Sequence, residues 1–99
     1  MSVLVSIRIP GDVAKFKQLL ASDSDRFASI AEHAKAEGAI HHQFAAGDGY
    51  VLVVDEWESA GAFQRFFESP EIAQIMVDAG AQGEPEVVVA EAIESPDRF

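Results

Sequence analysis

The sequence contains no cysteine among its 99 residues, and it has only one tryptophan and one tyrosine. Without cysteine there is no disulfide and no thiol chemistry, which fits a reducing compartment. No apolar run approaches the roughly 20 residues needed to span a bilayer, and the N-terminal segment lacks the basic region of a signal peptide. We therefore expect a cytoplasmic protein with no membrane partner.

Basic residues are also scarce. Seven Lys and Arg stand against 17 Asp and Glu, which gives a formal net charge of −10 at pH 7. Such a charge repels phosphate backbones and anionic lipid surfaces, so nucleic acid is not an expected partner. The aromatic residues are dominated by seven Phe, a set suited to building a core rather than to stacking on bases.

Common catalytic and cofactor motifs are missing as well. The chain has no Walker loop, no GxGxxG after a strand and no GxSxG elbow, and neither Ser6 nor Ser59 has a base at motif spacing. His41 and His42 are adjacent, so they point to opposite faces of a strand and cannot chelate one ion, and His33 has no recognisable ligand set around it. We expect no metal and no cofactor.

The clearest structural signal is a hairpin between residues 38 and 59. Two runs of strand-forming residues, 39–45 and 50–57, flank the pair Asp48-Gly49. This pair favours a tight hairpin turn because a type I′ turn needs positive φ at both central positions. The sequence therefore predicts two antiparallel strands with Asp48 and Gly49 at the tip.

The remaining segments alternate between strand and helix patterns. Period-2 alternation predicts a first strand over residues 2–9, and helical periodicity predicts a region over 12–37 that begins at Asp12 and is kinked or broken near 22–24. Two short helices follow, after Ser59 and after Ser69, and a Val-rich run predicts a last strand over 86–94. We interpret residues 1–94 as one domain and residues 95–99 as a tail.

This order, β-α-β-β-α-β, is the ferredoxin-like α+β arrangement, with an antiparallel sheet and helices on one face. The open face would carry apolar residues on several strands: Leu4, Leu52, Val54, Val88 and Ala90. We therefore predict a homodimer packed through the open sheet faces. Arg8 shares the polar register of the first strand and is expected to pair with a carboxylate, with anion binding as the alternative.

The hairpin register places candidate chemistry on one face. With Asp48-Gly49 as a two-residue loop, His42 lies opposite Asp55, and Trp57 lies one step along the same face. Ile40 and Phe44 fall on this face as well, while Ala39, His41 and Glu56 fall on the other. A carboxylate beside an imidazole fixes its tautomer and raises its basicity, as a general base requires. The alternative is a cross-strand hydrogen bond with a structural role only.

Aromatic residues at helical spacing follow the hairpin. Phe63, Phe66 and Phe67 form a stripe, and Met76 lies on the next helix. Most of this stripe is expected in the core. Together with Trp57 it could also line an apolar pocket between helices and sheet, the usual form of a small-molecule site.

Several of these residues carry a resemblance to a known family. Trp57-Glu58-Ser59, then Ala62-Phe63, then Ser69-Pro70-Glu71 resemble the antibiotic-biosynthesis-monooxygenase-like group of dimeric α+β barrels. The resemblance implies a homodimer with one cavity per subunit between sheet and helices. Some members oxidise polycyclic aromatic substrates with O₂ and no cofactor, and others degrade haem.

The resemblance also separates these activities. The haem-degrading branch relies on an Asn, a Trp and a His, and the corresponding positions here look like Ile7, Phe66 and Met76. None of these side chains ligates iron as His does, so haem degradation is disfavoured. Trp57 and Arg8 match by type the residues that oxygenase members place near substrate.

The sequence thus predicts a small-molecule enzyme that resembles cofactor-independent monooxygenases and acts on an aromatic or enolisable substrate. His42 and Asp55 are the candidate catalytic residues. The expected substrate-binding residues are Trp57, Phe63, Phe66, Met76 and Phe44. Two alternatives stay open: a non-catalytic dimeric ligand-binding or interaction module, and an isomerase or cyclase that uses the same base without O₂.

Overall fold

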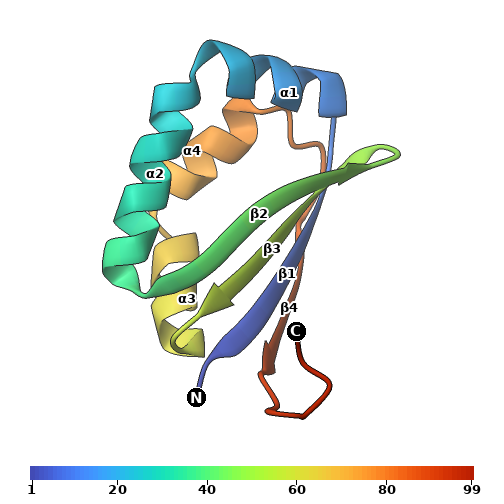
Figure 1. The fold of residues 1–99 in the computed structure, drawn as a ribbon. Helices are drawn as coiled ribbons and strands as arrows, with labels where there is room; N and C mark the ends of the chain where they lie inside the picture. Colours follow the sequence, from blue (N-terminus) through green and yellow to red (C-terminus); the bar gives the residue numbers. More distant parts are fainter.

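The chain folds into a four-stranded antiparallel sheet with all of its helices on one face (Figure 1). The computed structural model describes residues 1–99, and the strands lie in the order β2-β3-β1-β4. The predicted ferredoxin-like α+β fold is confirmed. The elements, in chain order, are β1 (Val3–Pro10), α1 (Val13–Ser22), α2 (Ser24–Glu37), β2 (Ala39–Gly47), β3 (Tyr50–Trp57), α3 (Ala60–Phe67), α4 (Pro70–Asp78) and β4 (Glu86–Glu91).

The first helical region begins, breaks and ends where its polar residues predict. The Asp12 carboxylate accepts a hydrogen bond from the Lys15 backbone N–H at 3.1 Å, which caps α1. Asp23 then separates α1 from α2, so the predicted break near 22–24 is confirmed. Gly38 ends α2 at φ 122°, a conformation that favours glycine.

The second helical region uses two serines at helix starts, with different outcomes. The Ser59 hydroxyl accepts from the Ala62 N–H at 3.1 Å and caps α3. Ser69 precedes α4 as predicted, but its hydroxyl makes no capping bond and is buried without a hydrogen-bond partner. Pro70, in the first turn, starts this helix without losing an intrahelical hydrogen bond.

The last strand is shorter than the predicted 86–94. It ends at Glu91 because Glu91 lies opposite Val3, the first residue of β1, so later residues have no strand beside them. Residues 92–99 form an irregular hook near the N-terminus (Figure 1). The first strand also begins and ends one residue later than expected.

The buried core lies between the sheet and α3. Its members are Val3, Val5, Ile7, Val53, Trp57, Ala62 and Phe63. Trp57 and Val5 are the largest fully buried side chains. By contrast, α2 has no fully buried side chain at all. The helix layer is therefore packed tightly at α3 and loosely at α2.

The face of the sheet opposite the helices is open and partly apolar. Leu4, Val54 and Val88 are 52%, 42% and 60% exposed. The expected ion pair of Arg8 on this face is wrong, because the guanidinium lies over the Tyr50 ring at 4.2 Å and forms no salt bridge. Tyr50 lies two residues before Leu52, the cross-strand partner of Arg8, and its ring face attracts the cation at that distance.

Two polar contacts attach α2 to α4. Arg26 Nη1 lies 2.9 Å from Asp78 Oδ2, and the His33 ring nitrogen Nδ1 lies 3.0 Å from Glu71 Oε2. The hydrogen bond from Arg26, and then the one from Gln74, hold the pKa of Asp78 below its ordinary value of 3.8. None of the helices is long and apolar enough to cross a membrane.

The Arg26–Asp78 pair should make stability depend on pH. Because the pKa of Asp78 is lower in the folded chain than in the unfolded chain, its carboxylate stabilises the fold above pH 3.8, and this contribution is lost as the pH falls through the folded value. We expect Asp78→Asn to lower the thermal midpoint at pH 7, with the difference from wild type disappearing on acidification. Thermal unfolding followed by circular dichroism across pH measures this.

A matched control removes a charge elsewhere. Asp48 is exposed at the hairpin tip and has no ion-pair partner, and Asn suits that turn equally well. Asp48→Asn should leave the pH dependence of the midpoint unchanged. An equal, pH-dependent loss in both variants would show that net charge, not the Arg26 contact, is responsible.

Candidate functional site

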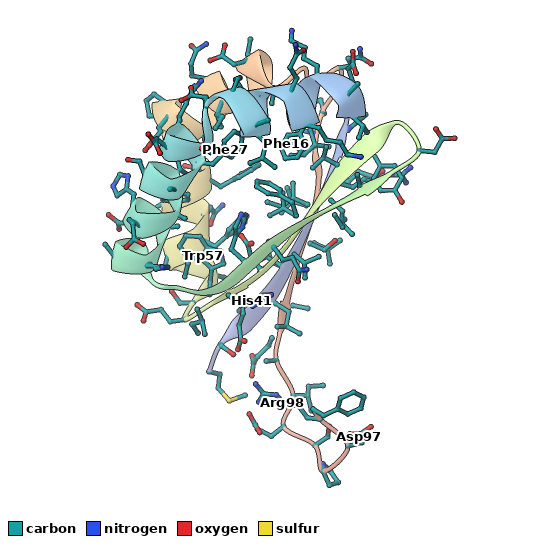
Figure 2. The ribbon with its side chains drawn as sticks, turned by 45° about the horizontal axis from the view of Figure 1, so that its top comes forward. Phe16, Phe27, His41, Trp57, Asp97 and Arg98 are labelled. Carbon is teal, nitrogen blue, oxygen red and sulfur yellow. The ribbon has the colours of Figure 1, made fainter.

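The hairpin of β2 and β3 brings the candidate residues together. Gly47 pairs with Tyr50, Phe44 with Val53, His42 with Asp55 and His41 with Glu56, as the two-residue loop predicts. Side chains alternate between the two faces of a strand, so His42 and Asp55 both face the helices. His41 lies on the other side of the sheet (Figure 2).

One part of the predicted register is wrong. A bulge between Ala39 and His41 places Ala39 opposite Trp57 and leaves Ile40 unpaired. Ala39 therefore packs against the core on the helix side, whereas Ile40 is 58% exposed. An extra residue in one strand reverses the facing of the positions beyond it, and here this exchanges Ala39 and Ile40.

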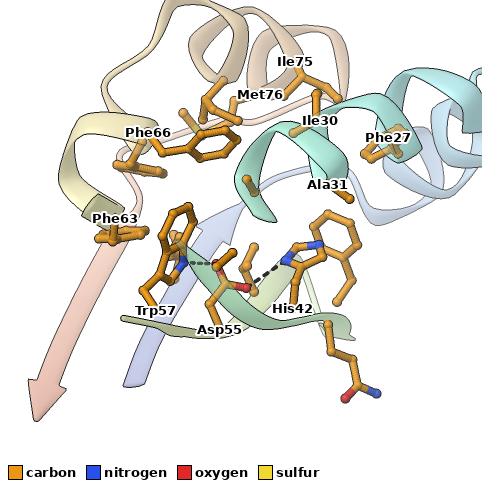
Figure 3. A pocket seen from close by; sticks show the side chains of 18 of the residues that line it. Phe27, Ile30, Ala31, His42, Asp55, Trp57, Phe63, Phe66, Ile75 and Met76 are labelled. Carbon is orange, nitrogen blue, oxygen red and sulfur yellow. Dashed lines mark hydrogen bonds and ion pairs between the residues drawn. The ribbon is translucent and has the colours of Figure 1, made fainter. Parts of the chain in front are cut away.

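Asp55 is the polar centre of the site. Its Oδ1 lies 2.7 Å from Nδ1 of His42, and its Oδ2 accepts a hydrogen bond from the Trp57 indole N–H at 3.1 Å (Figure 3). Asp55 is 8% exposed and Trp57 2% exposed, while the His42 side chain is 41% exposed. The carboxylate is thus buried and held by two partners, and the imidazole extends from it toward solvent.

A cavity of about 420 Å³ opens beside this triad, between the sheet and the helices (Figure 3). Seventeen of its 20 lining residues are hydrophobic. The Trp57 ring contacts Phe63 and Phe66 at centroid distances of 5.8 and 5.4 Å, and the His42 ring meets Phe44 edge-on at 4.7 Å. The site is therefore an apolar cavity with one polar cluster, formed by His42, Asp55 and the Trp57 N–H.

Every residue predicted for the site lines this cavity. They are His42, Asp55, Trp57, Phe63, Phe66, Met76 and Phe44. Sequence reasoning missed the contribution of α2, whose Phe27, Ile30, Ala31 and Ala34 form one wall. Their spacing predicts an apolar helix face, but that pattern does not distinguish a wall of a cavity from a packed core. The Trp57–Asp55 hydrogen bond was also missed, although i and i+2 on one strand share a face.

The other histidines lie elsewhere. His33 is on the outer surface of the helix layer with Glu71, and His41 is exposed on the open sheet face. Glu56, opposite His41, instead accepts a hydrogen bond from the Ser2 hydroxyl at 2.6 Å. Only His42 combines a carboxylate partner with access to the cavity.

This geometry is suited to proton transfer. An ionised Asp55 that accepts a hydrogen bond from the Nδ1–H of His42 leaves Nε2 as the free basic nitrogen. The Trp57 N–H fixes the carboxylate in turn, so the three side chains form a chain of oriented hydrogen bonds. A ligand in the cavity that reaches Nε2 would meet a positioned proton acceptor.

No protein-family model matches the chain, and no curated protein matches it by sequence. Solved structures do share its fold. A monooxygenase from the ActVA-Orf6 gene of Streptomyces coelicolor, in complex with nanaomycin D, superposes with a TM-score of 0.68 at 18% identity over 99% of this chain and 93% of the other.

Two further structures agree. SnoaB, a cofactor-independent oxygenase from Streptomyces nogalater, gives a TM-score of 0.65 at 18% identity over 98% of both chains. An antibiotic biosynthesis monooxygenase gives 0.65 at 12% identity over 93% of this chain and 99% of that one. The chain therefore has the fold of the antibiotic biosynthesis monooxygenases, as its sequence resemblance implied.

The burial of Asp55 leads to a stability prediction. Asp55→Ala removes the only acceptor of the buried Trp57 N–H, and an unsatisfied buried donor costs about 1–3 kcal/mol. His42→Ala removes a half-exposed ring and leaves Asp55 bonded to Trp57, so it should cost less. Urea unfolding measures both free energies, and equal losses in the two variants would contradict the central position of Asp55.

Proposed function

We propose that the protein binds an aromatic or enolisable small molecule in the cavity and oxidises it with O₂ without a cofactor. The observation that carries the proposal is the His42–Asp55 pair at the edge of an otherwise apolar chamber of about 420 Å³. A volume of this size suits a ring system of moderate size. The shared fold with oxygenases, one of them in complex with nanaomycin D, supports the same class of reaction.

In this proposal each residue of the triad has one role. His42 accepts a proton from the substrate hydroxyl or acidic C–H through Nε2, which leaves an electron-rich anion. A carbon of this anion forms a bond to O₂, the proton returns to give a hydroperoxide, and loss of one water molecule leaves a carbonyl that retains one oxygen atom. Asp55 holds the imidazole in the required tautomer and stabilises the imidazolium that forms. The apolar walls surround the reacting anion with hydrophobic side chains.

The remaining predicted residues shape the chamber. Phe63 and Phe66 contact the Trp57 ring, and Met76 and Phe44 also line the cavity, so a flat substrate would lie among aromatic faces. Aromatic pairs of this kind contribute favourable interaction free energy in addition to that of the apolar area they bury. These residues bind the substrate in the proposal and do not take part in proton transfer.

The proton-acceptor role predicts a large effect on turnover. His42→Ala should reduce O₂ consumption with an accepted phenolic substrate by about 10²- to 10⁴-fold, the usual contribution of a general base. The measurement is an oxygen electrode combined with product detection. His41→Ala is the matched control, because it removes the neighbouring imidazole from the opposite face and should leave the rate unchanged.

Other results would select the alternatives. Unchanged turnover in His42→Ala would remove the proposed role of His42. Binding without O₂ consumption in any variant would favour a non-catalytic ligand-binding module. Conversion of the substrate without O₂ consumption would favour an isomerase or cyclase that uses the same base.

We also propose that two copies pack through their open sheet faces. Leu4, Val54 and Val88 expose apolar surface there, and a monomer gains nothing from leaving such residues in water. Burial of these side chains by a second copy would complete a second core on the far side of the sheet. The cavity would remain on the helix side of each subunit.

A single charged substitution on the open sheet face tests whether this face forms the dimer interface. Leu4→Glu should convert the dimer to monomers in light scattering at micromolar concentration, because a buried unpaired carboxylate is costly. Val77→Glu is the control, since Val77 is 67% exposed on α4, on the helix side of the molecule. Equal masses for wild type and Leu4→Glu would contradict this interface.

A further inference from the structure

The cavity contains very few polar groups. Among its 20 lining residues, 17 are hydrophobic and the other members are His42, Gln43 and Asp55. None is Lys or Arg. A ligand inside this chamber therefore has at most three polar side chains to contact, and no cationic side chain.

Two of these polar groups are already occupied or turned away. Both oxygens of Asp55 have partners inside the protein, His42 and the Trp57 N–H, and that indole N–H is used in the same contact. Gln43 pairs with Val54 rather than with Asp55, so strand alternation directs its side chain to the face opposite His42. It is exposed at the edge strand.

The His42 ring has one nitrogen without a partner in the protein. His42 Nδ1 is engaged by Asp55, and Nε2 has no hydrogen bond within the protein. With Nδ1 carrying the proton toward an ionised carboxylate, Nε2 presents a lone pair and accepts a hydrogen bond. The cavity thus presents hydrogen-bond acceptors and no free side-chain donor, and Nε2 is the acceptor that has no partner inside the protein.

The charges around the cavity also disfavour an anionic ligand. An anionic ligand would enter a chain of net charge −10 and find no cation in the chamber. Protonated His42 would not compensate, because Asp55 at 2.7 Å already neutralises it. Burial of an unpaired carboxylate in apolar surroundings is unfavourable.

We infer that the cavity selects an uncharged, largely apolar molecule with a single hydroxyl that donates to His42 Nε2, and that it discriminates against anions and against molecules that only accept hydrogen bonds. The inference rests on the proposed function for taking this cavity as the ligand site. It adds the charge and the hydrogen-bonding sense of the ligand. The charge and the hydrogen-bonding sense of the ligand both follow from the hydrogen bonds that Asp55 makes with His42 and with the Trp57 N–H.

Binding of three matched probes tests the inference without any turnover. At pH 7, 4-propylphenol is uncharged and donates a hydrogen bond, 4-propylanisole only accepts one, and 4-propylbenzoate is an anion. Trp57 is the only tryptophan of the chain and lines the cavity, so its fluorescence reports binding directly, with calorimetry as a check. We expect the phenol to bind about tenfold tighter than the anisole, since one hydrogen bond contributes up to about that factor, and the benzoate to bind weakest.

Substitution then locates the acceptor. His42→Phe keeps an aromatic ring at the cavity but removes Nε2. The phenol and the anisole should then bind this variant with about equal affinity. His41→Phe changes the same residue type on the opposite face and should keep the preference. Circular dichroism confirms that each variant is folded, and the three wild-type affinities stand as a test by themselves.

Several outcomes would overturn the inference. They are equal affinity for phenol and anisole in the wild type, tightest binding of the benzoate, a preference that survives His42→Phe, and no binding of any probe up to its solubility limit. The proposed oxidation fails separately. Phenol selectivity with no O₂ consumption would refute the oxidation and leave the ligand selectivity intact.

Discussion

The buried carboxylate of Asp55 is the interaction on which the site depends. Its two oxygens bind two side chains of different kinds, the His42 imidazole and the Trp57 indole. A charge this deeply buried is tolerated only with partners, so the register of the hairpin and the position of the Trp57 ring are linked. A shift of β2 by one residue would turn His42 to the other face and place His41 or Gln43 opposite Asp55 instead.

The same hairpin also separates two surfaces with different chemistry. On the helix side, alternate residues of β3 supply Val53, Asp55 and Trp57 to the core and cavity. On the other side, Leu52, Val54 and Glu56 belong to the open sheet face. One strand therefore serves a ligand chamber and a candidate subunit interface at once, and substitutions at neighbouring positions should act on separate properties.

Most of the fold was predictable because its signals are local. Asp48-Gly49 determines the hairpin register, Asp12 and Ser59 cap helices, and the polar run around Asp23 breaks the helical region. The pairing of His42 with Asp55 followed from the two-residue loop alone. The bulge at Ile40 did not, because an extra residue near a strand end leaves no distinct mark in a short apolar run.

The parts of the site that escaped prediction depend on tertiary packing. The apolar face of α2 reads equally well as core or as cavity wall, and only the distance between helix and sheet decides which. The position of Arg8 over Tyr50 similarly depends on the pairing of β1 with β3, not on a charge pattern. The roles of His42 and Asp55 are chemical proposals that the geometry permits.

The shallow burial of α2, which lines one wall of the chamber, bears on how a ligand would enter. This helix is bounded by Asp23 and Gly38, contains no fully buried side chain and is attached to α4 through side chains at the protein surface. Elements with few buried contacts are those that open first in native-state fluctuations, on a free-energy scale well below that of global unfolding. A local opening of α2 would therefore widen the chamber, while the sheet and α3 keep the hydrogen bonds among His42, Asp55 and Trp57 in place.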